Sequence, residues 1–207
     1  MSENVPLSEK VRGVGIDIET TDLYPSRGQI IQIAAIGFDK DFQEVSSFQI
    51  EINKWTDKFP HSYRVYGDAE AIEMHVESGL LTHVRELGVE WNTAITMLDE
   101  YLSCIIPEGK KFPLMGSSVQ FDRDWLKYYA KDVLKAHFTY RNMDASSVYE
   151  AIKLLPQETQ DSIQEEIDQE VSKLDGVDHH ALYDIRKSLS YWRVYSRRLA
   201  DIDRFSE

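Results

Sequence analysis

The stretch VGIDIE at residues 14–19 and the stretch QIIQIAAIGF at residues 29–38 together decide the fold of this chain. The first alternates apolar and acidic residues, and the second is almost entirely apolar, so both predict β-strands. A third run, EVSSFQIEI at residues 44–52, alternates in the same way. Because only short turns separate the three runs, they predict an antiparallel meander at the start of the fold.

After the meander, strands and helices alternate along the chain. Short apolar runs predict a fourth strand at residues 112–118 and a fifth at residues 138–146. Apolar residues at helical spacing predict helices over residues 71–79, 91–106, 121–134, 146–155 and 179–202. This order predicts an α/β fold of the ribonuclease H-like kind, in which helices flank a mixed five-stranded sheet.

The composition fits a chain that folds as one domain over residues 1–207. Hydrophobic residues make up 42% of the sequence, but no apolar run approaches the roughly 20 residues that span a bilayer. The first residues lack the apolar core of a secretory signal, so we expect a cytoplasmic protein without a membrane partner. The single cysteine, Cys104, excludes an internal disulfide and is expected to be buried in the helix over residues 91–106.

The charge balance argues against tight binding of long nucleic acids. The sequence carries 23 Lys and Arg against 36 Asp and Glu, a net charge of −13, whereas long duplexes are held by basic surfaces. Eight acidic residues and a single lysine lie at residues 156–178, where apolar residues at helical spacing predict an acidic helical insertion. The insertion could act as a lid, a dimer element or a partner surface, but a solvated helix is the simpler interpretation.

Asp17 and Glu19 form the first candidate motif. Residues two apart on a strand share a face, so both carboxylates project together while Ile16 and Ile18 face the other layer. Two carboxylates on an apolar strand are costly unless water or a metal ion solvates them. A strand end that runs into solvent is the alternative interpretation.

Asp122 in GSSVQFD and the pair His179 and Asp184 in DHHALYD supply the other candidate residues. Asp122 is expected in the first turn of a helix, where a carboxylate is also common as an ordinary cap. His179 and Asp184 lie at the start of the last predicted helix, where both side chains can reach one site. An imidazole titrates near neutrality and suits a general base, although two adjacent histidines are also typical of a solvated surface.

The four carboxylates make chemical sense only if they converge. Four acids without a basic partner repel one another, and they stay ionised together only when cations lie between them. Such a cluster is typical of a two-metal site that cleaves phosphodiesters. Ligation by oxygen atoms alone favours Mg²⁺ or Mn²⁺ over Zn²⁺.

The motifs, in this order, resemble the DEDDh branch of the DnaQ-like 3′→5′ exonucleases, and within it the oligoribonucleases. The resemblance spans about Val14 to Tyr195. It rests on the stretches DIETTDL with IIQIAAI, GSSVQFDRDWLKYY, YRNMDASSV and HHALYDIRKSLSYWRVY. The activity that it implies is the release of 5′-mononucleotides from the 3′ end of short single-stranded RNA.

The resemblance also implies the roles of the candidate site residues. Two Mg²⁺ or Mn²⁺ ions per active site would be bound, and His179 would be the general base. The implied metal ligands are Asp17, Glu19, Asp122 and Asp184.

For the substrate, the resemblance implies four further contacts. Leu23 would wedge against the bases, and Ser118 would cap the 5′ phosphate of a dinucleotide. Tyr140 and Arg141 would reach into the site from the partner subunit of a homodimer, where an arginine can hold a phosphate through two hydrogen bonds. An ordinary charge on a strand edge is the alternative interpretation of Arg141.

The sequence departs from the oligoribonuclease pattern at three places. Ser117 stands where the family has asparagine, Thr139 where it has histidine, and YGDAEAIEMHVESGL lacks the family's tryptophan. Without that tryptophan, a broader exonuclease acting on single-stranded DNA or longer RNA stays open. A non-catalytic scaffold, and a proofreading subunit that binds a polymerase through the acidic helix, are further alternatives. All five candidate metal and base residues are present, which argues against the scaffold.

Overall fold

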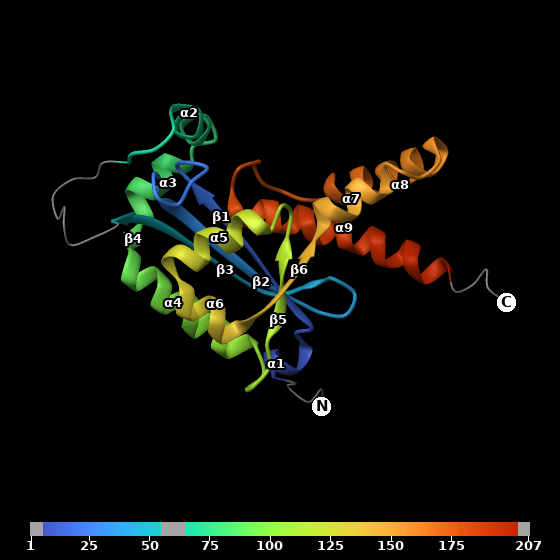
Figure 1. The fold of residues 1–207 in the computed structure, drawn as a ribbon, viewed down its shortest axis with the longest axis horizontal. Helices are drawn as coiled ribbons and strands as arrows, with labels where there is room; N and C mark the ends of the chain where they lie inside the picture. Colours follow the sequence, from blue (N-terminus) through green and yellow to red (C-terminus); the bar gives the residue numbers. More distant parts are fainter. Residues whose placement is uncertain (1–5, 55–64, 203–207) are drawn as a thin grey trace.

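A six-stranded mixed sheet forms the centre of the computed structural model, which describes residues 6–54 and 65–202 (Figure 1). The strands are β1 (Gly13–Thr20), β2 (Ile30–Phe38), β3 (Glu44–Lys54), β4 (Val89–Glu90), β5 (Phe112–Gly116) and β6 (Phe138–Asp144). Across the sheet they lie in the order β4-β3-β2-β1-β5-β6. The strand with the first acidic motif, β1, is therefore an interior strand.

The predicted meander is confirmed, because β1 pairs antiparallel with β2 and β2 pairs antiparallel with β3. β5 lies parallel to β1, and β6 lies parallel to β5, so the sheet is mixed as expected. The predicted count of five strands is wrong, since β4 adds a strand that runs parallel to the end of β3. β4 has only two residues, which is too short to show the alternation from which strands are predicted.

Nine helices flank the sheet within the described part of the chain. They are α1 (Leu7–Lys10), α2 (Ala69–Glu77), α3 (Leu80–Leu87), α4 (Trp91–Ile105), α5 (Gln120–Tyr129), α6 (Lys131–His137), α7 (Ala145–Ile152), α8 (Gln157–Val171) and α9 (Ala181–Ile202). The helix predicted over residues 121–134 is interrupted at Ala130, whose φ of −132° and ψ of 42° are not helical. The apolar spacing predicts neither α1 nor α3, which have four and eight residues.

The alternation of β1 sorts its side chains between two layers of helices. Ile16 and Ile18 face α4 to α6, where they join Leu98, Leu102 and Trp125 in the main core. The opposite face of β1 and β2 packs against α9, whose apolar residues form a second core. Burial of apolar surface is worth roughly 25 cal/mol per Å², so the apolar side chains of β1 turn toward the main core. Because side chains alternate along a strand, the acidic residues of β1 must then point toward α9.

α9 approaches β1 closely because a glycine stands beneath it. A Cβ atom on Gly15 would lie 3.0 Å from Cγ2 of Ile185 and 2.7 Å from Cε of Met115. Ile185 and Leu189 are buried against Ala34 of β2. This close packing brings the first turns of α9, and the residues just before them, next to β1.

The acidic segment at residues 156–178 contains α8, which packs along α9 (Figure 1). The predicted amphipathic helix is confirmed, because Ile163 and Ile167 are buried with Val194 of α9. Glu170 adds ion pairs with arginines of α9. The helix is therefore solvated on one face only, and its other face is a structural layer over α9.

The position of Cys104 differs from the expectation. Cys104 is exposed rather than buried, because it follows the buried Leu102 by two residues and so points about 200° around the helix from it. Part of the segment at residues 53–70, for which the sequence predicts no element, lies outside the described residues. Among the described helices, none combines the length and the apolar character needed to cross a bilayer.

Substituting Ile167 by alanine tests whether α8 is a structural layer. Ile167 is 3% exposed, and truncation of such a side chain leaves a cavity, so we expect a loss of about 2–5 kcal/mol in the free energy of unfolding. Glu165→Ala changes an exposed residue of the same helix and is the control, with an expected effect within about 0.5 kcal/mol. Urea unfolding measures both. Equal small effects would contradict the packing of α8 on α9.

Candidate active site

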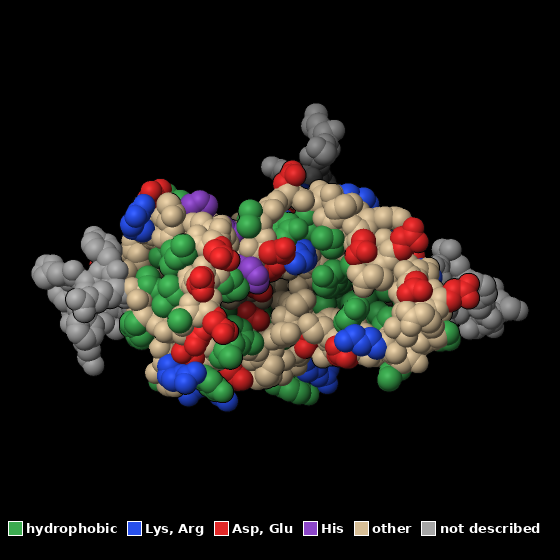
Figure 2. Space-filling view, turned by 90° about the horizontal axis from the view of Figure 1, so that it is seen from above, with side chains coloured by type: hydrophobic (Ala, Val, Ile, Leu, Met, Phe, Trp, Pro, Cys, Tyr) green, Lys and Arg blue, Asp and Glu red, His purple; other side chains and the backbone are tan. Residues whose placement is uncertain are grey.

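The candidate site lies at the end of β1, beneath the start of α9. Asp17 and Glu19 stand opposite Ala34 and Gln32 of β2, on the face that α9 covers. Seen from above, acidic and histidine side chains gather around a hollow in the middle of the molecule (Figure 2). The alternation of β1 therefore places both carboxylates as the sequence predicts.

Three of the four predicted carboxylates converge on one point. Ligand oxygens of Asp17, Glu19 and Asp184 all lie within 4.8 Å of one another. Asp122 lies in the first turn of α5, as predicted, and its Oδ1 accepts a hydrogen bond of 3.1 Å from the N–H of Ile18. This bond fixes the fourth carboxylate beside the strand residue that separates Asp17 from Glu19.

Burial and mutual repulsion raise the pKa of each of these carboxyl groups and so favour its protonated form. Burial, followed by the charges of Asp122, Glu19 and Asp184, raises the pKa of Asp17 well above its usual value. Burial, followed by Asp184 and Asp122, raises the pKa of Glu19 to about 8. Burial also raises the pKa of Asp122 to about 8 and raises that of Asp184. The cluster therefore needs cations to ionise, and its oxygen-only donor set suits a hard divalent ion.

His179 lies in the turn before α9, so the prediction that the helix includes this residue is wrong. Its backbone φ is 64°, in the left-handed region that an α-helix excludes. Its N–H donates a hydrogen bond of 3.1 Å to Oδ2 of Asp184, and its side chain is exposed beside the cluster. His180 points away from the cluster, because its ring Nε2–H donates to the carbonyl of Ser78 at 3.1 Å.

A cavity of about 340 Å³ opens beside Glu19. Leu23, Met74 and Phe121 provide its apolar walls. The Leu23 side chain is 72% exposed, so it stands free at the edge of the cavity. The cavity therefore places an apolar surface directly beside the carboxylate cluster.

Ser118 lies in the loop before α5, with a φ of 54°. Its N–H donates to Oδ1 of Asp144 at 2.9 Å, and its hydroxyl lies 3.3 Å from the hydroxyl of Ser146. Ser146 belongs to the stretch YRNMDASSV, but no motif in the sequence singles it out. The two hydroxyls form a pair of hydrogen-bonding groups at the surface.

Tyr140 and Arg141 lie on β6, an edge strand of the sheet. Tyr140 is 82% exposed, and Nε of Arg141 donates to its hydroxyl at 3.3 Å. The contacts described for the folded chain join these two residues to each other but not to the carboxylate cluster. Within one chain they are therefore not part of the site.

Two buried polar residues that the sequence analysis missed brace the site. Gln32 accepts a hydrogen bond of 2.8 Å from the N–H of Ala181, the first residue of α9, and donates one of 3.0 Å to Glu51. His75 of α2 is fully buried, and its ring Nε2–H donates to the carbonyl of Thr20 at 2.9 Å. The glutamine inside QIIQIAAIGF was a visible sequence signal, because a polar residue in a buried strand needs a partner.

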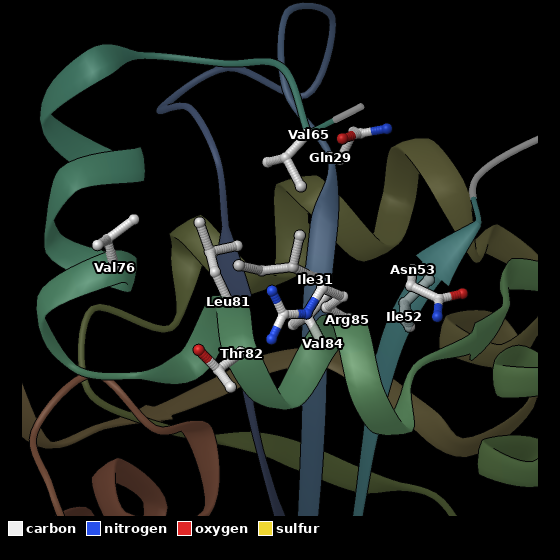
Figure 3. Close-up of a pocket in the computed structure, with 10 residues that line it drawn as sticks. All are labelled: Gln29, Ile31, Ile52, Asn53, Val65, Val76, Leu81, Thr82, Val84 and Arg85. Carbon is white, nitrogen blue, oxygen red and sulfur yellow. The ribbon is translucent and has the colours of Figure 1, made fainter. Parts of the chain in front are cut away.

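A second cavity, of about 350 Å³, lies between α3 and the strands β2 and β3 (Figure 3). Ile31, Leu81 and Val84 line its apolar part, and Arg85 and Asn53 are polar lining residues. None of its ten lining residues is a carboxylate, so this cavity does not share the chemistry of the cluster.

A family model described as Exonuclease matches residues 14–191. The chain belongs to the exonuclease family. The match includes every residue of the carboxylate cluster and His179. The protein is therefore a phosphodiester hydrolase of the 3′→5′ exoribonuclease class, and the family together with the carboxylate cluster indicates dependence on a divalent metal.

Relatives of this exonuclease carry the name oligoribonuclease. The oligoribonuclease of Vibrio cholerae is 31% identical over 190 residues, which are 91% of this chain and 96% of the relative. That of Shewanella sp. (strain MR-4) is 27% identical over 189 residues, with the same coverage. The resemblance stated from the motifs is confirmed by these matches.

Solved structures confirm the ribonuclease H-like fold of the exonuclease. S. pombe Pop2p, in a form with Mg²⁺ and Mn²⁺ bound, aligns with a TM-score of 0.61 at 16% identity over 90% of this chain and 83% of that chain. The zinc-bound complex of E. coli exonuclease I with single-stranded DNA aligns with a TM-score of 0.63 at 13% identity. That alignment covers 93% of this chain but 42% of the larger enzyme.

The raised pKa values make the stability of the metal-free exonuclease depend on pH. Because the folded state favours the protonated carboxyls, the contribution of the cluster to stability is fully present below the unfolded pKa values near 4 and is lost as pH rises toward about 8. A divalent ion binds the ionised form, so excess Mn²⁺ should raise the melting temperature more at about pH 8.5 than at about pH 5.5. Thermal unfolding with Mn²⁺ and with EDTA measures this difference.

Glu19→Gln is the matched variant for that measurement. It keeps the shape of the side chain but removes one titration, so the metal-free protein should lose less stability between the two pH values. A metal-induced rise in melting temperature that is the same at both pH values would contradict the assignment of the cluster as the metal site.

Proposed function

We propose that this exonuclease removes 5′-mononucleotides from the 3′ end of short RNA with two Mg²⁺ or Mn²⁺ ions per active site. Asp17, Glu19, Asp122 and Asp184 would hold the ions. The observation that carries the proposal is the convergence of three carboxylates within 4.8 Å with Asp122 fixed beside them. When bound, the ions lower the pKa of the attacking water and stabilise charge on the leaving 3′ oxygen.

His179 takes the proton of the attacking water in this proposal. The carboxylate of Asp184 accepts a hydrogen bond from the backbone N–H of His179, so this bond leaves the ring nitrogens of His179 available to a water. The exposed position of the ring gives both water and substrate access to it. An imidazole is a side chain suited to accept that proton and to release it to solvent.

Three features support a short RNA as the substrate. Relatives that match over 91% of this chain and 96% of their own length are named oligoribonucleases. The cavity bordered by Leu23 is about 340 Å³, and it opens directly beside Glu19. The net charge of −13 argues against the tight binding of a long polymer, which usually requires a basic surface.

A second copy of the chain would complete the substrate site. Ser118 and Ser146 offer paired hydroxyls that can bind a 5′ phosphate. Tyr140 and Arg141 stand exposed on the edge strand β6 and contact each other. In a homodimer these two residues would enter the site of the other chain, where the guanidinium can hold the same phosphate.

A broader exonuclease acting on single-stranded DNA or longer RNA is the second candidate. The wall that α2 contributes to the cavity contains Ala71 and Met74 and no aromatic residue. Stacking of a base on an aromatic ring is worth about 1–3 kcal/mol. Without such a ring on this wall, the enzyme should prefer a dinucleotide over a longer strand less strongly.

The length preference is tested with 5′-labelled RNA of two, five and twenty nucleotides, incubated with Mg²⁺ or with EDTA. We expect rapid cleavage of the dinucleotide, slow attack on the longest strand, and none in EDTA. Equal or faster processing of the longest strand would keep the chemistry and favour the broader exonuclease. Absence of cleavage at every length, in both Mg²⁺ and Mn²⁺, would contradict the proposed activity.

Matched variants on α5 test the metal ligands in the same assay. Asp122→Asn should reduce turnover by at least about 10²-fold, because the amide cannot supply a charged ligand oxygen. Asp124→Asn changes an exposed carboxylate two residues away and should retain turnover within about twofold. His179→Ala should lower turnover by about 10²–10⁴-fold while Mn²⁺ binding persists. Retention of more than a tenth of the activity in Asp122→Asn would exclude its role as a ligand.

A complementation assay tests the contribution of the second chain. Arg141→Ala and Asp17→Asn should each be inactive on a dinucleotide with a 5′ phosphate, since each lacks one part of the site. A mixture of the two should regain activity, because a heterodimer contains one complete site. Sedimentation at the assay concentration provides the control. A monomer, or a mixture that stays inactive, would remove Tyr140 and Arg141 from the site.

A further inference from the structure

The segment that carries His179 is held against α9 in a conformation that the backbone alone disfavours. Gly176 has a φ of 153°, and His179 has a φ of 64°. A residue with a Cβ atom rarely adopts the left-handed region unless surrounding contacts impose it. The contacts that impose it on His179 therefore determine where its imidazole stands.

Side chains from the first two turns of α9 supply these contacts. The backbone of Gly176 packs so closely on Tyr183 that a Cβ would lie 2.3 Å from a ring carbon. The carboxylate of Asp178 receives a hydrogen bond of 2.6 Å from Nζ of Lys187. Asp184 then binds the N–H of His179. Each end of the segment is thus tied to α9.

Lys187 has the central place in this arrangement. Its Nζ lies 2.6 Å from Oδ1 of Asp178 and 3.6 Å from Oδ1 of Asp184, and it stands 5.5 Å from the ring centroid of Tyr183. Its side chain is 27% exposed and that of Asp178 is 63% exposed, so the ion pair is shielded from water on the lysine side only.

We infer that Lys187 is a positioning residue, whose ion pair with Asp178 latches the segment 176–179 to α9 and so fixes His179 over the carboxylate cluster. The inference rests on the proposed function, in which His179 is the general base. A base must meet the water within hydrogen-bonding distance, and a displacement of about 1 Å can cost as much as 10²-fold in rate. The latch acts on turnover through His179 and not through contact with the substrate.

The latch itself is tested without any substrate. Lys187→Met and Asp178→Ala should each increase hydrogen–deuterium exchange at the His179 amide by at least about tenfold, because its bond to Asp184 opens more often. Lys153→Met is the matched control, since Lys153 also forms an ion pair at 2.6 Å, with Glu150, and stands 4.8 Å from a tyrosine ring. Unchanged exchange in Lys187→Met or in Asp178→Ala would overturn the inference, whatever the activity of the protein.

The second readout separates positioning from other roles. Both latch variants should lower kcat about 10- to 100-fold with KM and Mn²⁺ affinity within about threefold of the original protein. Lys187→Arg should restore most of kcat, and the double variant should be no slower than the slower single variant. A raised KM with unchanged kcat would mean contact with a substrate phosphate and would overturn the inference. A lower kcat in Lys187→Met with an unchanged kcat in Asp178→Ala would mean that Lys187 acts through Asp184, and this result would also overturn the inference.

The wild-type protein and His179→Ala are assayed beside these variants. If the wild type cleaves no substrate in either Mg²⁺ or Mn²⁺, the proposed function is contradicted. The hydrogen–deuterium exchange data would still show whether the Lys187–Asp178 ion pair holds His179 in place. An active wild type with unaffected latch variants would overturn the latch and leave the proposed function standing.

Discussion

The repulsion among buried carboxylates is the constraint on which the rest of this structure depends. Glu19 and Asp122 are 7% and 3% exposed, and like charges removed from water cannot stay ionised together without cations. The protein must therefore hold these groups close through forces that do not act on the carboxylates themselves. Apolar packing on the opposite face of β1 and beneath α9 supplies those forces, and the acidic residues are carried into place by the strand and helix that bear them.

A few hydrogen bonds between distant parts of the chain then convert approximate packing into a defined site. Gln32 accepts a hydrogen bond from the N–H of Ala181, the first residue of α9, and this bond fixes the position of that helix along β2. The N–H of Ile18 binds Asp122, which ties α5 to β1 at the point where the acids converge. Both bonds are buried, where an unpaired partner would be costly, so they specify one arrangement of the elements and exclude neighbouring ones.

Local patterns predicted the strands of the meander, the mixed sheet and the grouping of Asp17 with Glu19, because each depends on a period of two or on a turn. They failed where long-range contacts decide. His179 looks helical in the sequence, yet its bond to Asp184 places it outside the helix. β4 exists only because β3 offers it a partner. Cys104 follows helical geometry to the solvent side although Leu102 and Ile105 close to it are buried. The roles of Gln32 and His75 depend on partners more than 50 residues away.

The charge of Lys187 shows why the cluster requires mobile cations rather than basic side chains. Its ammonium lies 3.6 Å from Asp184 and acts to lower the pKa of Asp17, yet burial and three neighbouring acids still raise that pKa well above its usual value. One fixed positive charge at the rim therefore does not balance four carboxylates. A second fixed cation inside the cluster would occupy the space that water and the scissile phosphate need. A divalent ion would resolve the conflict, because it would supply two charges within the volume of a single atom.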